Sequence, residues 1–167
     1  MLPAQLAALR AARLMVLAVP AALLGGAYLS QYGFGLYPCE MCWWQRYPHF
    51  AALALALFGF ALPARRWPVA LAALAIAASG LVGLFHAGVE YHWWQGFTAC
   101  TSAVQAGGDP LAAIMDAPMV RCDQAQWTLF GISLAGYNFL ISGAGALLAG
   151  LLLARSNKVE PHVHALG

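Results

Sequence analysis

Four long apolar runs alternate with polar segments along the chain. The runs cover about residues 14–32, 47–62, 69–88 and 129–154. Because roughly 20 consecutive apolar residues cross the hydrocarbon core of a bilayer, each run predicts a transmembrane helix. The second run is short, but the two tryptophans before it can lie among the headgroups and lengthen the span. The pattern predicts an all-α membrane protein with a four-transmembrane-helix bundle.

The polar segments show where the chain leaves the membrane. We expect outer loops over residues 33–46 and 89–128, and a short turn that carries Arg65 and Arg66. An arginine costs about 2.5–3.5 kcal/mol at mid-bilayer, so this turn must reach water. We treat residues 1–167 as a single membrane domain.

The second outer loop contains the pattern of one more short helix. Asp109 followed by Pro110 is typical of a helix start. The residues that follow share one apolar face at helical spacing, and they are Leu111, Ile114, Met115 and Met119. We expect a short interfacial helix here, lying on the membrane surface.

The first apolar run could also be the core of a secretory signal peptide. Such a core has about 7–15 apolar residues and precedes a cleavage site made of small residues. The run here is longer, so we expect a helix that the protein retains.

Composition excludes two broad classes of protein. Hydrophobic residues make up 62% of the chain and charged residues only 8%, whereas a soluble domain carries about 25% charged residues. A soluble globular protein is therefore excluded. The net charge of +2 is too small to indicate a nucleic-acid partner.

The positions of the cations predict the orientation in the membrane, because cytoplasmic segments are enriched in lysine and arginine. With four spans, only Arg46 and Arg121 fall on one side. The cations of the other side are Arg10, Arg13, Arg65, Arg66, Arg155 and Lys158. We therefore expect a multi-pass protein of the bacterial inner (plasma) membrane, with both termini cytoplasmic. In a Gram-negative cell, both cysteine-bearing loops would be periplasmic.

All four cysteines lie in these outer loops. Cys39 and Cys42 form a Cys-x-x-Cys motif, and the second loop carries Cys100 and Cys122. Disulfides persist on the oxidising side of a membrane, which agrees with the orientation predicted from charge. Two cysteine pairs in series, one of them at the bilayer edge, indicate a relay from a partner's thiols to a lipid-soluble oxidant.

Two features favour a thiolate at Cys42. It lies near the start of the second predicted helix, where free N–H groups carry partial positive charge. Arg46 follows four residues later, on the same helical face if the helix has already begun there. We expect Cys42 to donate electrons and Arg46 to stabilise negative charge on its sulfur or on the reduced acceptor.

The cysteines have two other interpretations. The Cys-x-x-Cys motif could be half of a zinc site, but Cys100 and Cys122 are too far apart in sequence to complete a zinc ribbon. Each loop could also hold a merely structural disulfide, which would not explain why Arg46 adjoins one pair. We expect no metal site.

Two histidines lie near the outer ends of the middle runs. His49 and His86 could ligate haem, contact a quinone or lie at the membrane interface, and the residues alone favour the interface. The aromatic residues nearby favour an interfacial belt over a cofactor site, and they are Tyr91, Trp93, Trp94 and Trp127.

Two motifs resemble one known family. The segment Pro38-Cys39-Glu40-Met41-Cys42, followed by Gln45-Arg46, resembles the first outer loop of DsbB-type disulfide bond formation proteins. Arg121-Cys122-Asp123, followed by Gln126–Gly131, is similar to the family's approach to its last helix. The order of the cysteines and of the apolar runs extends the resemblance over nearly the whole chain.

The resemblance implies a quinone-dependent thiol oxidoreductase that supports disulfide bond formation. Its partner would be a soluble periplasmic thioredoxin-like dithiol oxidase of the DsbA type, which would attack Cys100 of a Cys100–Cys122 disulfide. Cys39 would then exchange with Cys122, and Cys42 would pass electrons to ubiquinone or menaquinone. The cofactor-binding residues that the resemblance implies are Arg46 and His86.

Two alternatives lie outside this family. Vitamin-K-epoxide-reductase-like proteins use related four-helix redox chemistry, but their Cys-x-x-Cys usually lies near a final helix, and here it precedes the second. A non-enzymatic haem- or metal-binding membrane subunit would show a Soret band or bound zinc after purification.

Overall fold

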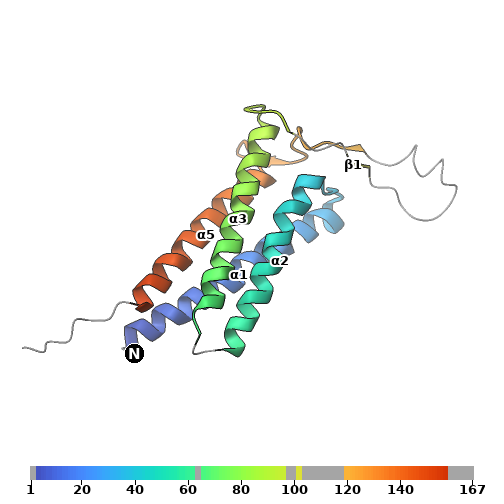
Figure 1. Ribbon diagram of the computed structural model, residues 1–167. Coiled ribbons are helices and arrows are strands. Elements are labelled where there is room, and N and C mark those ends of the chain that lie inside the picture. The colour runs from blue at the N-terminus through green and yellow to red at the C-terminus, as the bar shows by residue number, and fades with distance from the viewer. Residues whose placement is uncertain (1–2, 63–64, 97–100, 103–118, 158–167) are drawn as a thin grey trace, which may run out of the picture.

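Four helices form the body of the protein (Figure 1). The structure, a computed structural model, describes residues 3–62, 65–96, 101–102 and 119–157. The helices are α1 (Pro3–Phe34), α2 (Glu40–Ala61), α3 (Trp67–Glu90) and α5 (Leu134–Asn157).

The two ends of the bundle differ in what they carry. The start of α1, the end of α2 and the end of α5 lie at one end (Figure 1). The connection between α1 and α2, the end of α3 and the start of α5 lie at the other. Cys39 and Cys122 are therefore at the same end of the bundle, although 83 residues separate them. Cys100 and residues 109–118 of the predicted interfacial helix lie outside the described residues. Met119, predicted to lie on the apolar face of that helix, is in a strand.

The second helix begins earlier than its apolar run predicts, at Glu40 rather than at residue 47. Cys39 is extended, with φ −76° and ψ 176°, and its Sγ accepts a hydrogen bond from the backbone N–H of Cys42. A side chain that satisfies a free N–H of the first turn stabilises a helix start, and Glu40 in that turn complements the helix dipole. The expectation of a loop up to residue 46 was wrong, and the motif's second cysteine is helical.

The other helices also differ from the predicted ranges. α1 begins at Pro3 rather than at residue 14, and α3 extends two residues past the predicted range 69–88 at each end. α5 begins at Leu134 rather than at residue 129. Polar residues can continue a helix beyond its apolar run, so hydropathy alone does not mark the ends.

A hairpin occupies the start of the predicted fourth run. Strand β3 (Thr128–Leu129) pairs with β4 (Ile132–Ser133). The two turn residues, Phe130 and Gly131, have positive φ of 51° and 76°, as a type I′ hairpin turn requires. A second antiparallel pair joins β1 (Thr101–Ser102) to β2 (Met119–Val120), just before Cys122.

Three of the described helices are long and apolar enough to cross a membrane: α1, α3 and residues 134–156 of α5. α2 falls short of this criterion because its first half carries polar and charged residues. These residues are Glu40, Gln45, Arg46 and His49.

Small residues bring the helices close together. The buried cluster in the middle of the bundle consists mostly of alanine and valine, and it contains Ala12, Val16, Ala52, Ala56, Val69, Ala72, Ala73, Ile76 and Ala149. Small side chains let helix backbones approach, which is the main source of helix association where lipid surrounds the protein.

At Gly83, α3 packs closely against the backbone of α5. A Cβ there would lie 2.9 Å from the carbonyl oxygen of Ala135 and 2.9 Å from Nδ2 of Asn138. We expect Gly83→Ala to destabilise the protein by about 1–3 kcal/mol, because backbone cannot move aside as a flexible side chain can. Thermal unfolding in detergent micelles measures this.

A matched control for Gly83→Ala is the same substitution in α5. A Cβ at Gly143 would meet nothing within 4 Å. Gly143→Ala should leave stability unchanged or raise it by up to about 1 kcal/mol, since alanine is the better helix former. Equal melting temperatures for the two variants would contradict the close α3–α5 contact.

Candidate active site

Three sulfur and nitrogen ligands meet at the cysteine-bearing end of the bundle. Sγ of Cys39, Nε2 of His86 and Sγ of Cys122 all lie within 4.8 Å of one another, and all three residues are buried. They come from the start of α2, from α3 and from the segment before α5. The fold therefore joins the two cysteine-bearing segments that the sequence keeps apart.

Cys39 lies between the other two described cysteines. Its Sγ is 2.9 Å from Sγ of Cys42, a hydrogen-bonding distance for two thiols. Hydrogen bonding with Cys122 and with Cys42, together with burial, raises the pKa of the Cys39 thiol. Cys39 therefore keeps its proton and can donate a hydrogen bond to Cys42, which supports negative charge on the Cys42 sulfur.

The segment around Cys122 is held by contacts on both sides. Gln126 Nε2 donates to the backbone oxygen of Tyr37 at 2.7 Å, which fastens this segment to the loop before Cys39. Arg121 pairs with Asp123, and its hydrogen bonds lower the pKa of that exposed carboxyl group. These contacts hold in place the loop that positions Cys122 near Cys39.

His86 connects the sulfurs to the interior of the bundle. Its Nε2 is 3.6 Å from Sγ of Cys39 and 3.7 Å from Oε1 of Glu90. Its Nδ1 is 2.8 Å from Nε2 of Gln45, which is a donor, so Nδ1 accepts and the ring proton lies on Nε2. His86, for which the residues alone favoured the membrane interface, is therefore a buried neighbour of the thiols and does not face the outside of the bundle.

Arg46 is buried one helical turn after Cys42, with only 6% of its surface exposed. Its guanidinium donates to Oε1 of Gln31 at 2.7 Å and to the backbone oxygen of Ala27 at 3.2 Å. The rings of Tyr28 and Trp43 each lie 4.9 Å from its central carbon. These contacts hold a cation in place within the α1–α2 contact.

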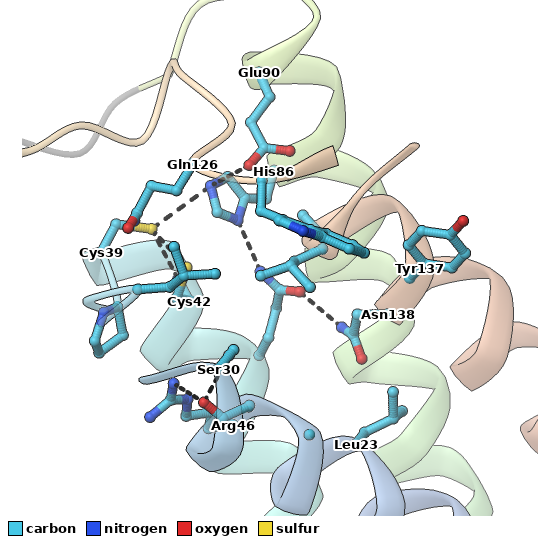
Figure 2. Close-up of a pocket in the computed structure, with 18 of the residues that line it drawn as sticks. Leu23, Ser30, Cys39, Cys42, Arg46, His86, Glu90, Gln126, Tyr137 and Asn138 are labelled. Carbon is cyan, nitrogen blue, oxygen red and sulfur yellow. Dashed lines mark hydrogen bonds and ion pairs between the residues drawn. The ribbon is translucent and has the colours of Figure 1, made fainter. Parts of the chain in front are cut away.

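A cavity of about 450 Å³ adjoins the sulfurs (Figure 2). Its walls come from α1, α2, α3, α5 and the β3 region, and they are mostly apolar. Cys39, Cys42 and His86 gather on one side of it in Figure 2, with Arg46 and Leu23 farther along. A mostly apolar pocket of this size, with a few convergent polar groups, is typical of a small-molecule site.

The sequence analysis missed a buried polar group deeper in the cavity wall. Asn138 Nδ2 donates to Oε1 of Gln45 at 2.8 Å, and Asn138 Oδ1 is 2.9 Å from Nε2 of His49. Ser79 and Ser142 also bond Asn138. An isolated asparagine within an apolar run is a signal for such a group, but the run does not say which helix holds its partners.

His49, for which the residues alone also favoured the membrane interface, is only 3% exposed and faces α5 through Asn138. Trp127, predicted to lie in an interfacial belt, lines the cavity and is 40% exposed.

The group formed by Cys39, His86 and Cys122 also has donors that suit a thiophilic metal such as zinc. The same sulfurs are the ones that can exchange disulfides, so a bound ion would compete with that chemistry. The sequence analysis expected no metal here.

Comparison with known proteins identifies relatives over most of the chain. The sequence profile of the disulfide bond formation protein DsbB family matches residues 9–152. Disulfide bond formation protein B of Aromatoleum aromaticum is 32% identical, over 87% of this chain and 93% of its own length. Disulfide bond formation protein B of Verminephrobacter eiseniae is also 32% identical, over 87% of this chain and 86% of its own length. The protein of the same name from Actinobacillus pleuropneumoniae is 28% identical, over 94% of this chain and 93% of its own length. No solved structure matches significantly.

Proposed function

The chain belongs to the DsbB family of disulfide bond formation proteins, and from this premise we propose that it oxidises a soluble periplasmic dithiol oxidase and passes the electrons to a membrane quinone. Membership makes it a membrane disulfide oxidoreductase. The observation that carries the finer proposal is the succession Cys122, Cys39, Cys42 and apolar cavity within one buried site.

The cavity suits a quinone ring. Its volume of about 450 Å³ lies in the range of small-molecule pockets. Apolar side chains of α1 and α5 line it, and they would contact a ring and the start of an isoprenoid tail. Leu23, Ala27, Leu134 and Ile141 belong to this lining. A bound quinone would supply the capacity to take up two electrons and two protons.

The cysteines have distinct roles in this proposal. The partner's thiolate attacks Cys100 of a Cys100–Cys122 disulfide, and the partner leaves oxidised. The freed Cys122 thiolate then attacks Cys39 of a Cys39–Cys42 disulfide, which needs only a small movement because the sulfurs of Cys122 and Cys39 lie within 4.8 Å. Cys42 leaves as the thiolate beside the cavity, and Cys100 then displaces Cys39 from Cys122, which restores the Cys100–Cys122 disulfide. The quinone would take up two electrons from Cys39 and Cys42, which restores their disulfide.

Arg46 and His86 have supporting roles. Arg46 adds fixed positive charge to the cavity wall, one turn after Cys42, where negative charge develops. His86, with its proton on Nε2, can donate a hydrogen bond to a Cys39 thiolate during exchange.

We also propose that α2 is a fourth membrane span within one domain. Its 22 residues reach about 33 Å at 1.5 Å per residue, enough for a hydrocarbon core of about 30 Å. Its polar residues face the cavity and neighbouring helices, as intramembrane polar residues do. With the charge asymmetry of the sequence, both termini would be cytoplasmic and the cysteines would face the periplasm.

An anaerobic mixing experiment tests the activity. The purified full chain, a reduced DsbA-type partner and a short-chain ubiquinone or menaquinone are combined, and quinone absorbance is followed. We expect rapid reduction of at least one quinone only when protein and reduced partner are both present. An oxidised partner is the control. No reduction with all four cysteines intact would overturn the proposal.

A further inference from the structure

A directional chain of hydrogen bonds runs from the sulfurs into the bundle. Gln45 Nε2 donates to Nδ1 of His86, and Gln45 Oε1 accepts from Nδ2 of Asn138. Figure 2 shows both bonds as dashed lines, from His86 at one end to the labelled Asn138 at the other. The next bond joins Asn138 to His49 at 2.9 Å. The side-chain amides of Gln45 and Asn138 therefore connect the two buried imidazoles, those of His86 and His49.

The amide of Asn138 fixes the tautomer of His49. Its Nδ2 is engaged by Gln45 and by the backbone oxygen of Ser79, so its Oδ1 is the atom that faces His49. An amide oxygen only accepts, so Nε2 of His49 must carry the ring proton. In the neutral ring, Nδ1 is then a lone-pair acceptor.

Nδ1 of His49 has no hydrogen-bond partner among the described residues. The side chain is 3% exposed, and it lines the cavity next to the cysteines. A buried acceptor without a partner costs roughly 1–3 kcal/mol of desolvation in general, so native proteins rarely keep one without a reason. Because His49 belongs to the cavity wall, a molecule bound in the cavity is the candidate donor.

His49 lies two helical turns from Cys42 on the same side of α2. Both residues line the cavity, as do Gln45 and Arg46 between them. Seven residues of helix span about 10.5 Å, which leaves room for one six-membered ring between the Cys42 sulfur and the His49 imidazole. The two side chains thus mark the two sides of one ring-sized space.

We propose that Nδ1 of His49 is a ring-oxygen subsite that accepts a hydrogen bond from a hydroxyl group of the reduced ring, the quinol. This inference rests on the proposed function. Oxidation of two thiols to one disulfide releases two electrons and two protons, and a quinol holds both of each in its two O–H groups. One of these O–H groups pairs with His49. A quinone carbonyl, which cannot donate, gains nothing from the same atom, so neutral His49 favours the reduced ring.

The test compares binding, without turnover. A Cys39→Ser/Cys42→Ser background prevents electron transfer in the full chain. The probes are a decyl-substituted benzoquinone, its hydroquinone and the dimethyl ether of that hydroquinone, which lacks O–H donors. Trp127 lines the cavity, so quenching of tryptophan fluorescence reports binding. We expect His49 to contribute about five- to tenfold to the preference for the hydroquinone over its ether.

Two variants separate the subsite from a structural role. His49→Gln places an amide N–H near the position of Nε2 and keeps the bond to Asn138, but it removes Nδ1. We expect it to lower the hydroxyl preference about five- to tenfold while quinone affinity changes less than twofold. His49→Asn places an amide near the position of Nδ1 and should retain part of the preference.

The outcomes distinguish the His49 subsite from the proposed function of quinone reduction. An unchanged hydroxyl preference in His49→Gln would overturn the subsite while leaving quinone binding intact. Failure of all three probes to bind the background protein would overturn the quinone site and the subsite together.

Discussion

Cys42→Ser is expected to lower the rate of quinone reduction to that of the uncatalysed background. A serine hydroxyl cannot form the disulfide that releases the electrons, and no other described thiol adjoins Cys39 on the cavity side. Without a Cys39–Cys42 disulfide, Cys122 has no disulfide to attack, so the electrons should stop at the Cys100–Cys122 pair. The measurements are quinone absorbance and the disulfides of the reacted protein by non-reducing peptide mapping.

The state of the second cysteine pair makes this prediction specific. Each chain of Cys42→Ser should oxidise one partner molecule, after which Cys100 and Cys122 should stay reduced although quinone is present. Glu40→Gln is the matched control, because it changes a neighbour in the same first turn and leaves all cysteines in place. Wild-type turnover by Cys42→Ser, or the same single turnover in Glu40→Gln, would refute the order of exchange.

Arg46→Met is expected to lower kcat/KM for quinone about 100-fold, comparable to the loss of one preorganised charge-stabilising donor in other enzymes. Methionine fills much of the same volume but removes the cation near Cys42. Arg46→Lys keeps the charge but loses the planar guanidinium that bonds Gln31 and Ala27. Its kcat/KM should therefore lie between those of the wild type and Arg46→Met. Steady-state kinetics with varied quinone provide the comparison.

The melting temperatures of the Arg46 variants must be measured together with kcat/KM, because the hydrogen bonds of Arg46 also join α1 to α2. If Arg46→Met and Arg46→Lys melt at similar temperatures and differ in kcat/KM, the charge is what matters to the reaction. Equal kcat/KM for wild type and Arg46→Met would remove Arg46 from the proposed site.

The sequence predicted the parts of this site that depend on local spacing. The Cys-x-x-Cys motif, its position near the start of the second helix and the nearby arginine all follow from residues 39–46. Apolar runs also indicated the helices, because lipid-facing and buried surfaces are both apolar in a membrane protein. The family resemblance then supplied the expectation about the second cysteine loop, and the profile match confirmed the family.

Helix ends and buried partners were not predictable in this way. The start of α2 depends on a thiol acting as a cap, which propensity rules do not include. The last run begins with a hairpin because Phe130 and Gly131 adopt positive φ, and nothing in an apolar window reveals that. The bonds of Asn138 reach Gln45 and His49, 93 and 89 residues away. Such pairings exist only once the helices have packed.

The same sulfur atom of Cys39 is both a reactant and the group that closes the first turn of α2. When that sulfur swings toward Cys122, the amide of Cys42 loses its acceptor, at a cost of about 1 kcal/mol for a typical helix cap. When it returns to Cys42, the turn is complete again. Each catalytic cycle would therefore open and re-form the first turn of α2 once. The rate of amide hydrogen exchange at Cys42 would then report the redox state of Cys39.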